Sequence, residues 1–410
     1  MARNAQIYKK IQPLHRYRDE AWKCLRCGLC RMVNPEHVKS PKWSNQCPSG
    51  TRFLFEAYFG SGKQEMVRAL TANPPELVMD SRLQHIIYTC VLCGACQQTC
   101  NCTKDLEPCN ASVALREHAV REGWGPLPEH EPLIKSILNY DNPWLQPRAA
   151  RAKWATRGDR KVKVKDASKE QVEVLYYPGC TASYDPGIQN VARDVVRLLD
   201  ASRVDFGILG KEEICCGSTI LRVGDRENFE GVRAKNMARL NKTRAKRIVS
   251  ACAGCYSTLK NEYGEGLEPE VMHIVEFIDE LIQDGRLKPD RPVNRKVTYH
   301  DPCHIGRYCG VYDAPRRILK SIPGIEFREM ERIREWAWCC AAGGGVRTAF
   351  PEKMAGWAAG LRLEEAIDTG ADTLVSACPF CEQNLGETAK AKTLDLEVVD
   401  IMKILSDAVT

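Results

Sequence analysis

Cysteines in the C-terminal part of this chain repeat one pattern twice. In each copy a lone cysteine precedes an adjacent pair by about 35 residues, and a CxxC within the phrase Ser-Ala-Cys-x-x-Cys follows after a similar interval. Five thiolates that converge on one inorganic cluster explain such a set better than packing does. The first set is Cys180, Cys215, Cys216, Cys252 and Cys255, and the second is Cys303, Cys339, Cys340, Cys378 and Cys381.

The N-terminal part contains two CxxCxxC runs. Three thiolates at this spacing lie on one tight turn and can hold three corners of a cubane [4Fe-4S] cluster. A glycine after the second cysteine, at Gly28 and Gly94, lets backbone N–H groups approach sulfur. Zinc would leave the third cysteine of each run surplus, so we predict two cubanes. The runs are Cys24, Cys27 and Cys30, and Cys90, Cys93 and Cys96.

The fourth ligand of each cubane is expected from outside its run. In two-cluster ferredoxins a Cys-Pro four residues after one run supplies the other cluster. Here that position holds Asn34 in the first run and Cys100 in the second, and a Cys-Pro occurs, displaced, at Cys47. We assign Cys100 to the first run and Cys47 to the second, with Cys102 and Cys109 as the alternatives.

Strand and helix patterns alternate through residues 171–410, which predicts an α/β layered unit around each five-cysteine set. Cysteines then stand at the carboxyl ends of strands, where such sheets place their sites. We expect a tandem α/β repeat of two pseudo-symmetric domains, preceded by a mainly helical dicluster domain. The predicted limits are 1–147, a basic linker 148–170, 171–290 and 291–410. The predicted strands are 172–177, 247–249, 296–300 and 373–375, and the predicted helices are 53–70, 111–121, 187–199, 227–241, 314–321 and 351–369.

Composition restricts the class of protein. The chain has 410 residues, 21 cysteines and a formal net charge of +6. It has no apolar run of membrane-spanning length and no signal-like N-terminal segment, so we expect a cytoplasmic protein without a disulfide framework. Cluster-bound thiolates would offset the positive charge, and nucleic-acid binding is therefore not predicted. We interpret the basic residues of 148–169 as a solvated linker rather than a docking patch.

The C-x34-CCG-x34-CxxC arrangement around Cys215, Cys216 and Gly217 resembles the CCG domain of heterodisulfide reductases. The N-terminal block is similar to the dicluster ferredoxin domain fused ahead of such repeats, as in the iron–sulfur subunit of glycolate oxidase. The resemblance implies that each five-cysteine set binds a noncubane four-iron cluster, and that two such clusters face each other in disulfide-reducing members. One departure is Ala341 after the second pair, which could alter the approach of the backbone to the cluster, and the glycines 343–345 could supply the same freedom.

The resemblance implies an iron–sulfur oxidoreductase subunit. Electrons from a flavoprotein or a membrane quinone-reactive partner would pass through the cubanes to the noncubane clusters, which would reduce a disulfide or oxidise a dithiol. The alternative is a relay subunit of a larger anaerobic complex, of the 2-hydroxyacid dehydrogenase or benzoyl-CoA reductase type. No flavin or nicotinamide motif is present, so this chain itself is expected to bind neither. Cluster-borne catalysis would involve Cys180, Cys215, Cys216, Cys303, Cys339 and Cys340.

Side chains near Cys303 have more than one interpretation. His304, our candidate catalytic residue, and His300 can each hydrogen-bond cluster sulfur, deliver a proton, or stabilise the turn. Arg307 is expected in a surface ion pair rather than on an anionic substrate. Cys309 has no counterpart in the first half and is interpreted as a packing residue. Trp336 and Trp338 are expected to form a hydrophobic wall.

Overall fold

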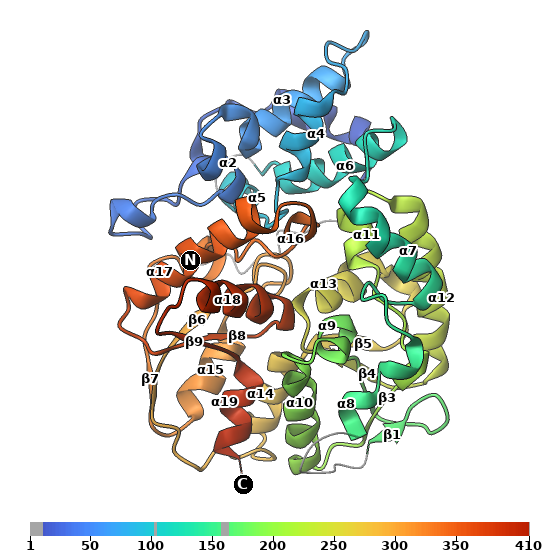
Figure 1. Cartoon of the computed structure of the whole chain (residues 1–410), viewed down its shortest axis with the longest axis vertical. Coiled ribbons are helices and arrows are strands. Elements are labelled where there is room, and N and C mark those ends of the chain that lie inside the picture. Colours follow the sequence, from blue (N-terminus) through green and yellow to red (C-terminus); the bar gives the residue numbers. More distant parts are fainter. Residues whose placement is uncertain (1–10, 102–104, 157–163, 410) are drawn as a thin grey trace.

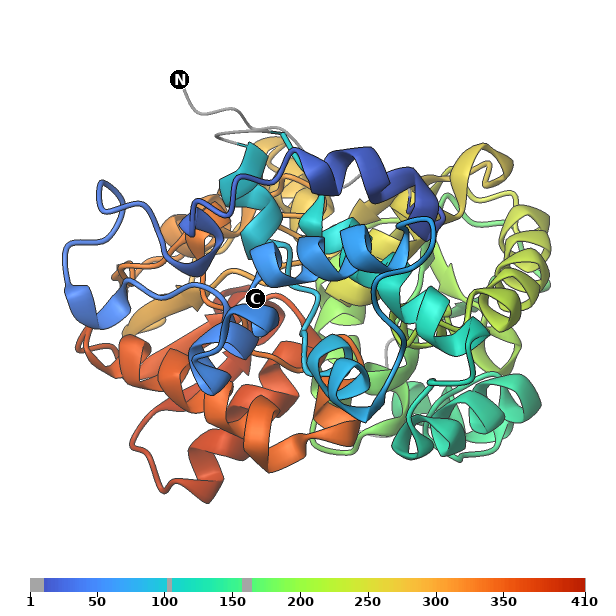
Figure 2. The same ribbon diagram turned by 90° about the horizontal axis from the view of Figure 1, so that it is seen from above.

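The structure is a computed structural model that describes residues 11–101, 105–156 and 164–409. A helical N-terminal part rests on two α/β bodies that stand side by side (Figure 1). Seen from above, the N-terminal part lies across both bodies (Figure 2). This arrangement confirms the predicted fold class of a helical domain followed by two α/β repeats.

The N-terminal part consists of short helices joined by turns. The predicted helix over 53–70 is wrong as one element, because Leu54 adopts a left-handed φ of 54° that ends one helix, and the next begins at Gly60. The chain doubles back there, which places the Phe59 ring on Gly50. The α-helices are α1 (Arg18–Trp22), α2 (Pro48–Phe53), α3 (Gly60–Leu70), α4 (Ser81–Tyr88), α5 (Ala95–Asn101), α6 (Pro108–Arg121) and α7 (Glu131–Tyr140), with 3₁₀ turns η1 (Leu14–Tyr17), η2 (Leu29–Arg31), η3 (Pro41–Trp43), η4 (Glu56–Tyr58) and η5 (Pro128–His130).

The first repeat is a parallel sheet of order β1-β3-β2-β4-β5. Its central strands are short and buried on both faces, as parallel sheets covered by helices require. The strands are β1 (Lys165–Asp166), β2 (Val174–Tyr176), β3 (Phe206–Ile208), β4 (Arg247–Ser250) and β5 (Glu270–His273). The helices are η6 (Arg148–Ala150), α8 (Lys153–Thr156), α9 (Gly179–Tyr184), α10 (Gln189–Ala201), η7 (Gly210–Glu212), α11 (Ser218–Arg222), α12 (Arg226–Lys242), α13 (Ala253–Glu262), η8 (Gly264–Gly266) and α14 (Ile274–Gln283).

The second repeat is a parallel sheet of order β7-β6-β8-β9. The predicted helix over 351–369 differs in its first turns, which are π-helical from Pro351 to Gly356. The strands are β6 (Arg295–His300), β7 (Ile325–Phe327), β8 (Thr373–Ser376) and β9 (Glu397–Asp400). The helices are α15 (Asp313–Ser321), η9 (Arg334–Trp336), α16 (Val346–Ala349), η10 (Pro351–Gly356), α17 (Trp357–Ile367), α18 (Pro379–Ala391) and α19 (Ile401–Ala408).

The two repeats pack against each other through equivalent helices. Helix α10 contacts α19, and their counterparts α15 and α14 contact each other in the same way. One hydrophobic core runs from the first sheet through these helices into the second. Reciprocal contacts of this kind are the signature of a two-fold interface, here within one chain.

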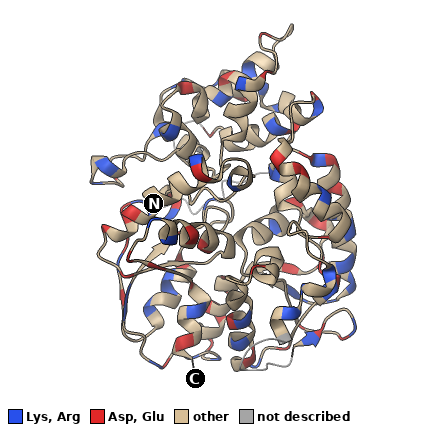
Figure 3. Cartoon of the chain, viewed as in Figure 1, with Lys and Arg blue, Asp and Glu red and all other residues tan. Residues whose placement is uncertain are grey.

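The segment expected as a solvated linker is largely packed. Trp154 is 1% exposed and Arg151 is 2% exposed, and Lys165–Asp166 forms the edge strand β1 of the first sheet. The expectation of a solvated segment is therefore wrong for these residues, whereas the domain limits remain predictions. Basic and acidic residues are interspersed over all parts of the chain in Figure 3. Every helix within the described ranges is too short or too polar to cross a bilayer.

Candidate iron–sulfur sites and a shared cavity

The first CxxCxxC run and Cys100 line one small cavity of about 30 Å³. The run follows α1 and turns into η2, and Cys100 comes from α5. Four sulfur atoms of the predicted set are thus brought together, and every cysteine in the described ranges is a free thiol. This donor set fits a cubane cluster, because a [4Fe-4S] cubane takes four thiolates.

The second run lies with Cys47 around a cavity of about 20 Å³. Cys47 precedes α2, and its Sγ accepts a hydrogen bond from Gly50 N at 3.4 Å. Cys109, the alternative ligand, lines the same cavity from α6. The other alternative, Cys102, lies outside the described residues. The neighbourhood therefore contains one thiol more than a cubane needs.

Both runs have the same backbone conformation. Arg26 and Leu92 have φ values of 52° and 51°, and Gly28 and Gly94 have values of 78° and 76°. Left-handed residues at matching positions wrap each run around a common centre. Gly60 separates the two sites, since a Cβ on it would lie 2.8 Å from the Cβ of Cys96 and 3.4 Å from that of Cys30. The two sites are therefore near neighbours.

Two serine variants decide the fourth ligand of the second cubane. Cys47→Ser is expected to abolish or strongly perturb that cluster, because oxygen is a poor substitute for thiolate on iron. Cys109→Ser is expected to keep it, since Cys109 Sγ already lies 3.2 Å from the Tyr308 hydroxyl. Iron content and the EPR spectrum of the reduced protein check this. The reverse pattern would make Cys109 the ligand.

Cluster loading is expected to depend on pH. Burial raises the pKa of Cys47 to about 12 and that of Cys100 to about 11. Both thiols therefore keep their protons at neutral pH in the apo-protein, and iron must displace these protons when it binds. The apparent affinity for iron(II) should rise with pH, by about tenfold per pH unit for each proton displaced. Anaerobic iron(II) titrations of apo-protein at pH 7, 8 and 9 measure this, and a flat profile would contradict it.

The two five-cysteine sets converge on a single cavity of about 280 Å³. In each repeat the lone cysteine and the CxxC follow adjacent parallel strands, β2 and β4 in the first and β6 and β8 in the second. The carboxyl ends of the two sheets thus open onto the same space. Its walls include all ten cysteines, namely Cys180, Cys215, Cys216, Cys252, Cys255, Cys303, Cys339, Cys340, Cys378 and Cys381.

The backbone after each adjacent cysteine pair is left-handed. Gly217 has a φ of 79°, and a Cβ there would lie 2.8 Å from the Phe229 ring. Ala341 adopts a φ of 62° at the equivalent position despite its Cβ. Ala341 thus takes this conformation itself, and Gly344, with a φ of 65°, is left-handed as well. Gly345, with a φ of 73°, precedes α16.

Thiol contacts connect the sites to one another. Cys252 of the first set and Cys378 of the second interact with each other across the cavity, which lowers the pKa of Cys378. Cys93 of the second cubane site is hydrogen-bonded to Cys339, which lowers the pKa of Cys93 to about 7. Cys340 and Cys381 have their sulfur atoms 3.3 Å apart. The second cubane site therefore adjoins the second repeat, which in turn adjoins the first.

The two repeats differ in the side chains beside their lone cysteines. In the first, Arg151 forms a buried ion pair with Glu213 at 2.6 Å and donates to Cys180 Sγ at 3.3 Å. In the second, His304 Nδ1 lies 3.3 Å from Cys303 Sγ. His304 lines the cavity and stacks on Tyr308, with ring centroids 4.3 Å apart. Its catalytic role remains a prediction.

The other side chains singled out from the sequence are buried. Arg307 is 2% exposed and donates to the carbonyl oxygens of Cys93, Glu335 and Ala337, so the expected surface ion pair is wrong. Trp336 and Trp338 are buried, as expected of a hydrophobic wall. Cys309 is buried and accepts a hydrogen bond from Asn261.

Sequence reasoning missed several buried arginines, among them three that contact or line the sites. Arg151 lies in the segment interpreted as a linker, Arg222 lines the shared cavity from α11, and Arg116 lies on α6. No motif surrounds them. The one available signal is the position of Arg222 six residues after the first cysteine pair.

Comparisons with known proteins cover both halves of the chain. The cysteine-rich domain named CCG matches residues 174–260 and 297–386, and a 4Fe-4S dicluster domain matches residues 12–103. One subunit of the dihydromethanophenazine:CoB–CoM heterodisulfide reductase of Methanosarcina mazei is 34% identical over 395 residues, 94% of this chain and 93% of that protein. These matches confirm the resemblance inferred from the cysteine spacing.

Two further relatives are longer than this chain. The probable iron-sulfur-binding oxidoreductase FadF of Bacillus subtilis is 35% identical over 363 residues, 87% of this chain and 51% of that protein. The EtfAB:quinone oxidoreductase of Syntrophomonas wolfei is 32% identical over 428 aligned residues, 94% of this chain and 59% of that protein. Most of this chain is thus similar to part of two longer oxidoreductases as well.

Proposed function

Because this chain belongs to the family of iron–sulfur oxidoreductase subunits that includes the heterodisulfide reductase relative, we propose that it exchanges electrons between a redox partner and a thiol or disulfide substrate. The two N-terminal sites would hold cubanes and the two repeats noncubane clusters. Such clusters supply one-electron transfer at potentials set by charge, hydrogen bonds and burial. The domain limits and the cysteine assignments given above are part of this proposal.

The single observation that carries the proposal is the shared cavity. All ten cysteines of the repeats line one space of about 280 Å³, and Cys252 meets Cys378 across it. A chain that only relayed electrons would need no such space beside both sets. Leu133, Trp144 and Phe380 contribute apolar side chains to the lining of this space. Reduction of a disulfide here takes up two electrons and two protons and yields two thiols.

Electrons are proposed to enter at the first cubane site. Cys27 is exposed, whereas the cysteines that line the second site are buried or partly buried. Apolar residues near Cys27 in the sequence are exposed: Trp22 is 58%, Leu25 67%, Leu29 40% and Met32 43% exposed. An exposed apolar group of this kind is typical of a docking face. A flavoprotein or another redox subunit is the partner class that fits.

The test is an anaerobic assay of the loaded protein with a reduced viologen dye and a series of disulfides. Dye oxidation that depends on a disulfide and yields thiols would support the proposal. Cys309→Ala is the matched control, because this buried cysteine belongs to neither set. Dye oxidation that requires an external electron acceptor and ignores every disulfide would instead indicate a relay subunit.

A further inference from the structure

His300 occupies a position where the two repeats differ. It ends β6, three residues before Cys303, and is 1% exposed. The counterpart in the first repeat is Tyr177, three residues before Cys180. The Tyr177 hydroxyl donates to the carbonyl oxygen of Ile214 and so has a protein partner.

The hydrogen bond from Arg362 fixes the imidazole tautomer. Arg362 Nε donates to His300 Nδ1 at 3.2 Å. A guanidinium has only donors, so Nδ1 must accept and Nε2 must carry the hydrogen. Arg362 is fully buried and is itself held by Arg332 O at 2.9 Å and by the Glu365 carboxylate at 2.8 Å. The ring therefore has one fixed orientation.

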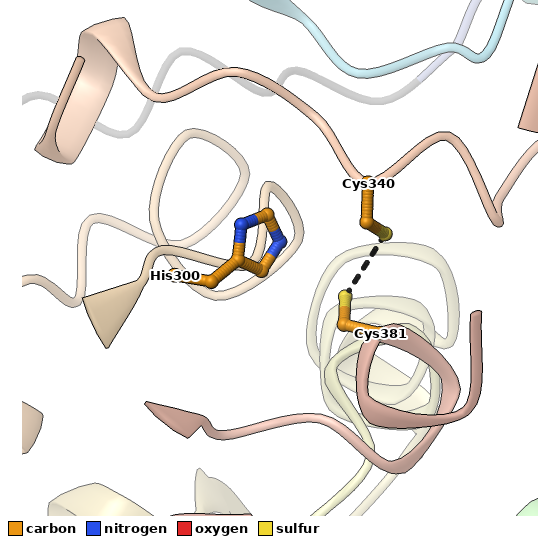
Figure 4. Close-up of side chains that lie close together, drawn as sticks. All are labelled: His300, Cys340 and Cys381. Carbon is orange, nitrogen blue, oxygen red and sulfur yellow. Dashed lines mark hydrogen bonds between the residues drawn. The ribbon is translucent and has the colours of Figure 1, made fainter. Parts of the chain in front are cut away.

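The Nε2–H group points toward the second five-cysteine set. One imidazole nitrogen and the sulfur atoms of Cys340 and Cys381 lie within 4.8 Å of one another. Figure 4 shows the outer nitrogen of the ring directed to the space beside these sulfurs. Nε2 is buried and makes no hydrogen bond of standard geometry among the described residues, although the His300 ring interacts with the Cys340 thiol. A buried N–H group without an acceptor is unfavourable, so an acceptor is expected in this space.

We propose that His300 donates its Nε2–H to a sulfur of the cluster held by the second repeat and raises the reduction potential of that cluster. Reduction adds negative charge to the cluster, and a fixed N–H donor stabilises the reduced state more than the oxidised one. His300 is then a positioning residue rather than an iron ligand, because Nε2 has no free lone pair in this tautomer.

EPR-monitored redox titration of the loaded full-length protein tests this. His300→Leu should lower the midpoint potential of the second-repeat signal, identified as the one lost in Cys378→Ser. We expect the ratio of reduced to oxidised cluster at fixed potential to fall about tenfold, equivalent to about 59 mV. His300→Gln keeps an N–H donor and should restore most of the shift. Tyr177→Phe is the matched control and should leave this signal in place.

An unchanged potential in His300→Leu would overturn the inference. So would an equal shift in the Leu and Gln variants, or a nitrogen hyperfine coupling of the size of a direct iron–nitrogen bond. Loss of the cluster in both variants would likewise make His300 a ligand and contradict the donor role. The inference rests on the proposed cluster of the second repeat but not on disulfide chemistry. The iron content of the wild-type protein distinguishes a failure of this inference from a failure of the proposed function. A wild-type protein without the second-repeat cluster would overturn the proposed function itself.

Discussion

Cys378→Ser is expected to remove the cluster of the second repeat and to abolish disulfide reduction, while both cubane signals persist. Cys378 follows β8, is 3% exposed and faces Cys252 across the cavity. Serine offers a harder oxygen ligand with a much higher pKa than a thiol, so it holds iron poorly. The protein should lose about four iron atoms, the content of one cluster. Iron and sulfide analysis with EPR of the reduced protein measures this.

The matched control for this variant is Cys309→Ala. Cys309 is also buried, and its replacement should leave the iron content unchanged. If Cys378→Ser loses all clusters together, the cysteine is needed for folding rather than for one site. If the variant keeps its full iron content, Cys378 is not a ligand and the five-cysteine assignment of the second repeat is wrong.

Arg116→Met is expected to destabilise the protein by at least about 3 kcal/mol and to disconnect the N-terminal part from the cavity. Arg116 is fully buried on α6. Its guanidinium donates to the carbonyl oxygens of Ile87, Tyr88 and Cys90 in the N-terminal part, and to those of Arg222 in the first repeat and Gly344 in the second. One side chain therefore joins all three parts, and its loss leaves buried acceptors unpaired.

Arg121→Met provides the comparison, because Arg121 lies on the same helix but is exposed. Urea denaturation should show a large loss of stability for Arg116→Met and a change within about 0.5 kcal/mol for Arg121→Met. Dye-driven reduction of the clusters in the repeats should also slow in the first variant alone. Equal stability of the two variants would contradict the bridging role of Arg116.

Most of what could be predicted of the fold and the sites came from the spacing of the cysteines. Repeated spacing indicated two equivalent α/β units, and the fold places their cysteines at strand ends around one cavity. Polar contacts between residues far apart in the sequence could not be predicted, because no local sequence pattern indicates them. Arg151 lies among basic residues typical of a solvated segment, and only the fold brings it against Glu213. Arg307 is likewise buried, and it donates hydrogen bonds to carbonyl oxygens of residues that are distant in the sequence.

Local propensity also failed where tertiary packing overrode it. The apolar pattern of residues 53–70 is compatible with one helix, yet Leu54 adopts a left-handed conformation so that Phe59 can pack on Gly50. Ala341 shows the same conflict, since it holds a conformation that favours glycine. The second departure directly follows Cys339 and Cys340 of the proposed cluster site, where the backbone must wrap around a centre.

The most direct test of the central claim is the EPR spectrum of anaerobically purified, oxidised protein with and without added thiols. If substrate sulfur reaches the clusters of the repeats through the shared cavity, a paramagnetic signal should appear only when thiol is present. Cys378→Ser should not give that signal. Cubane signals that are reducible but unaffected by any thiol would contradict chemistry in the cavity and leave electron relay as the function.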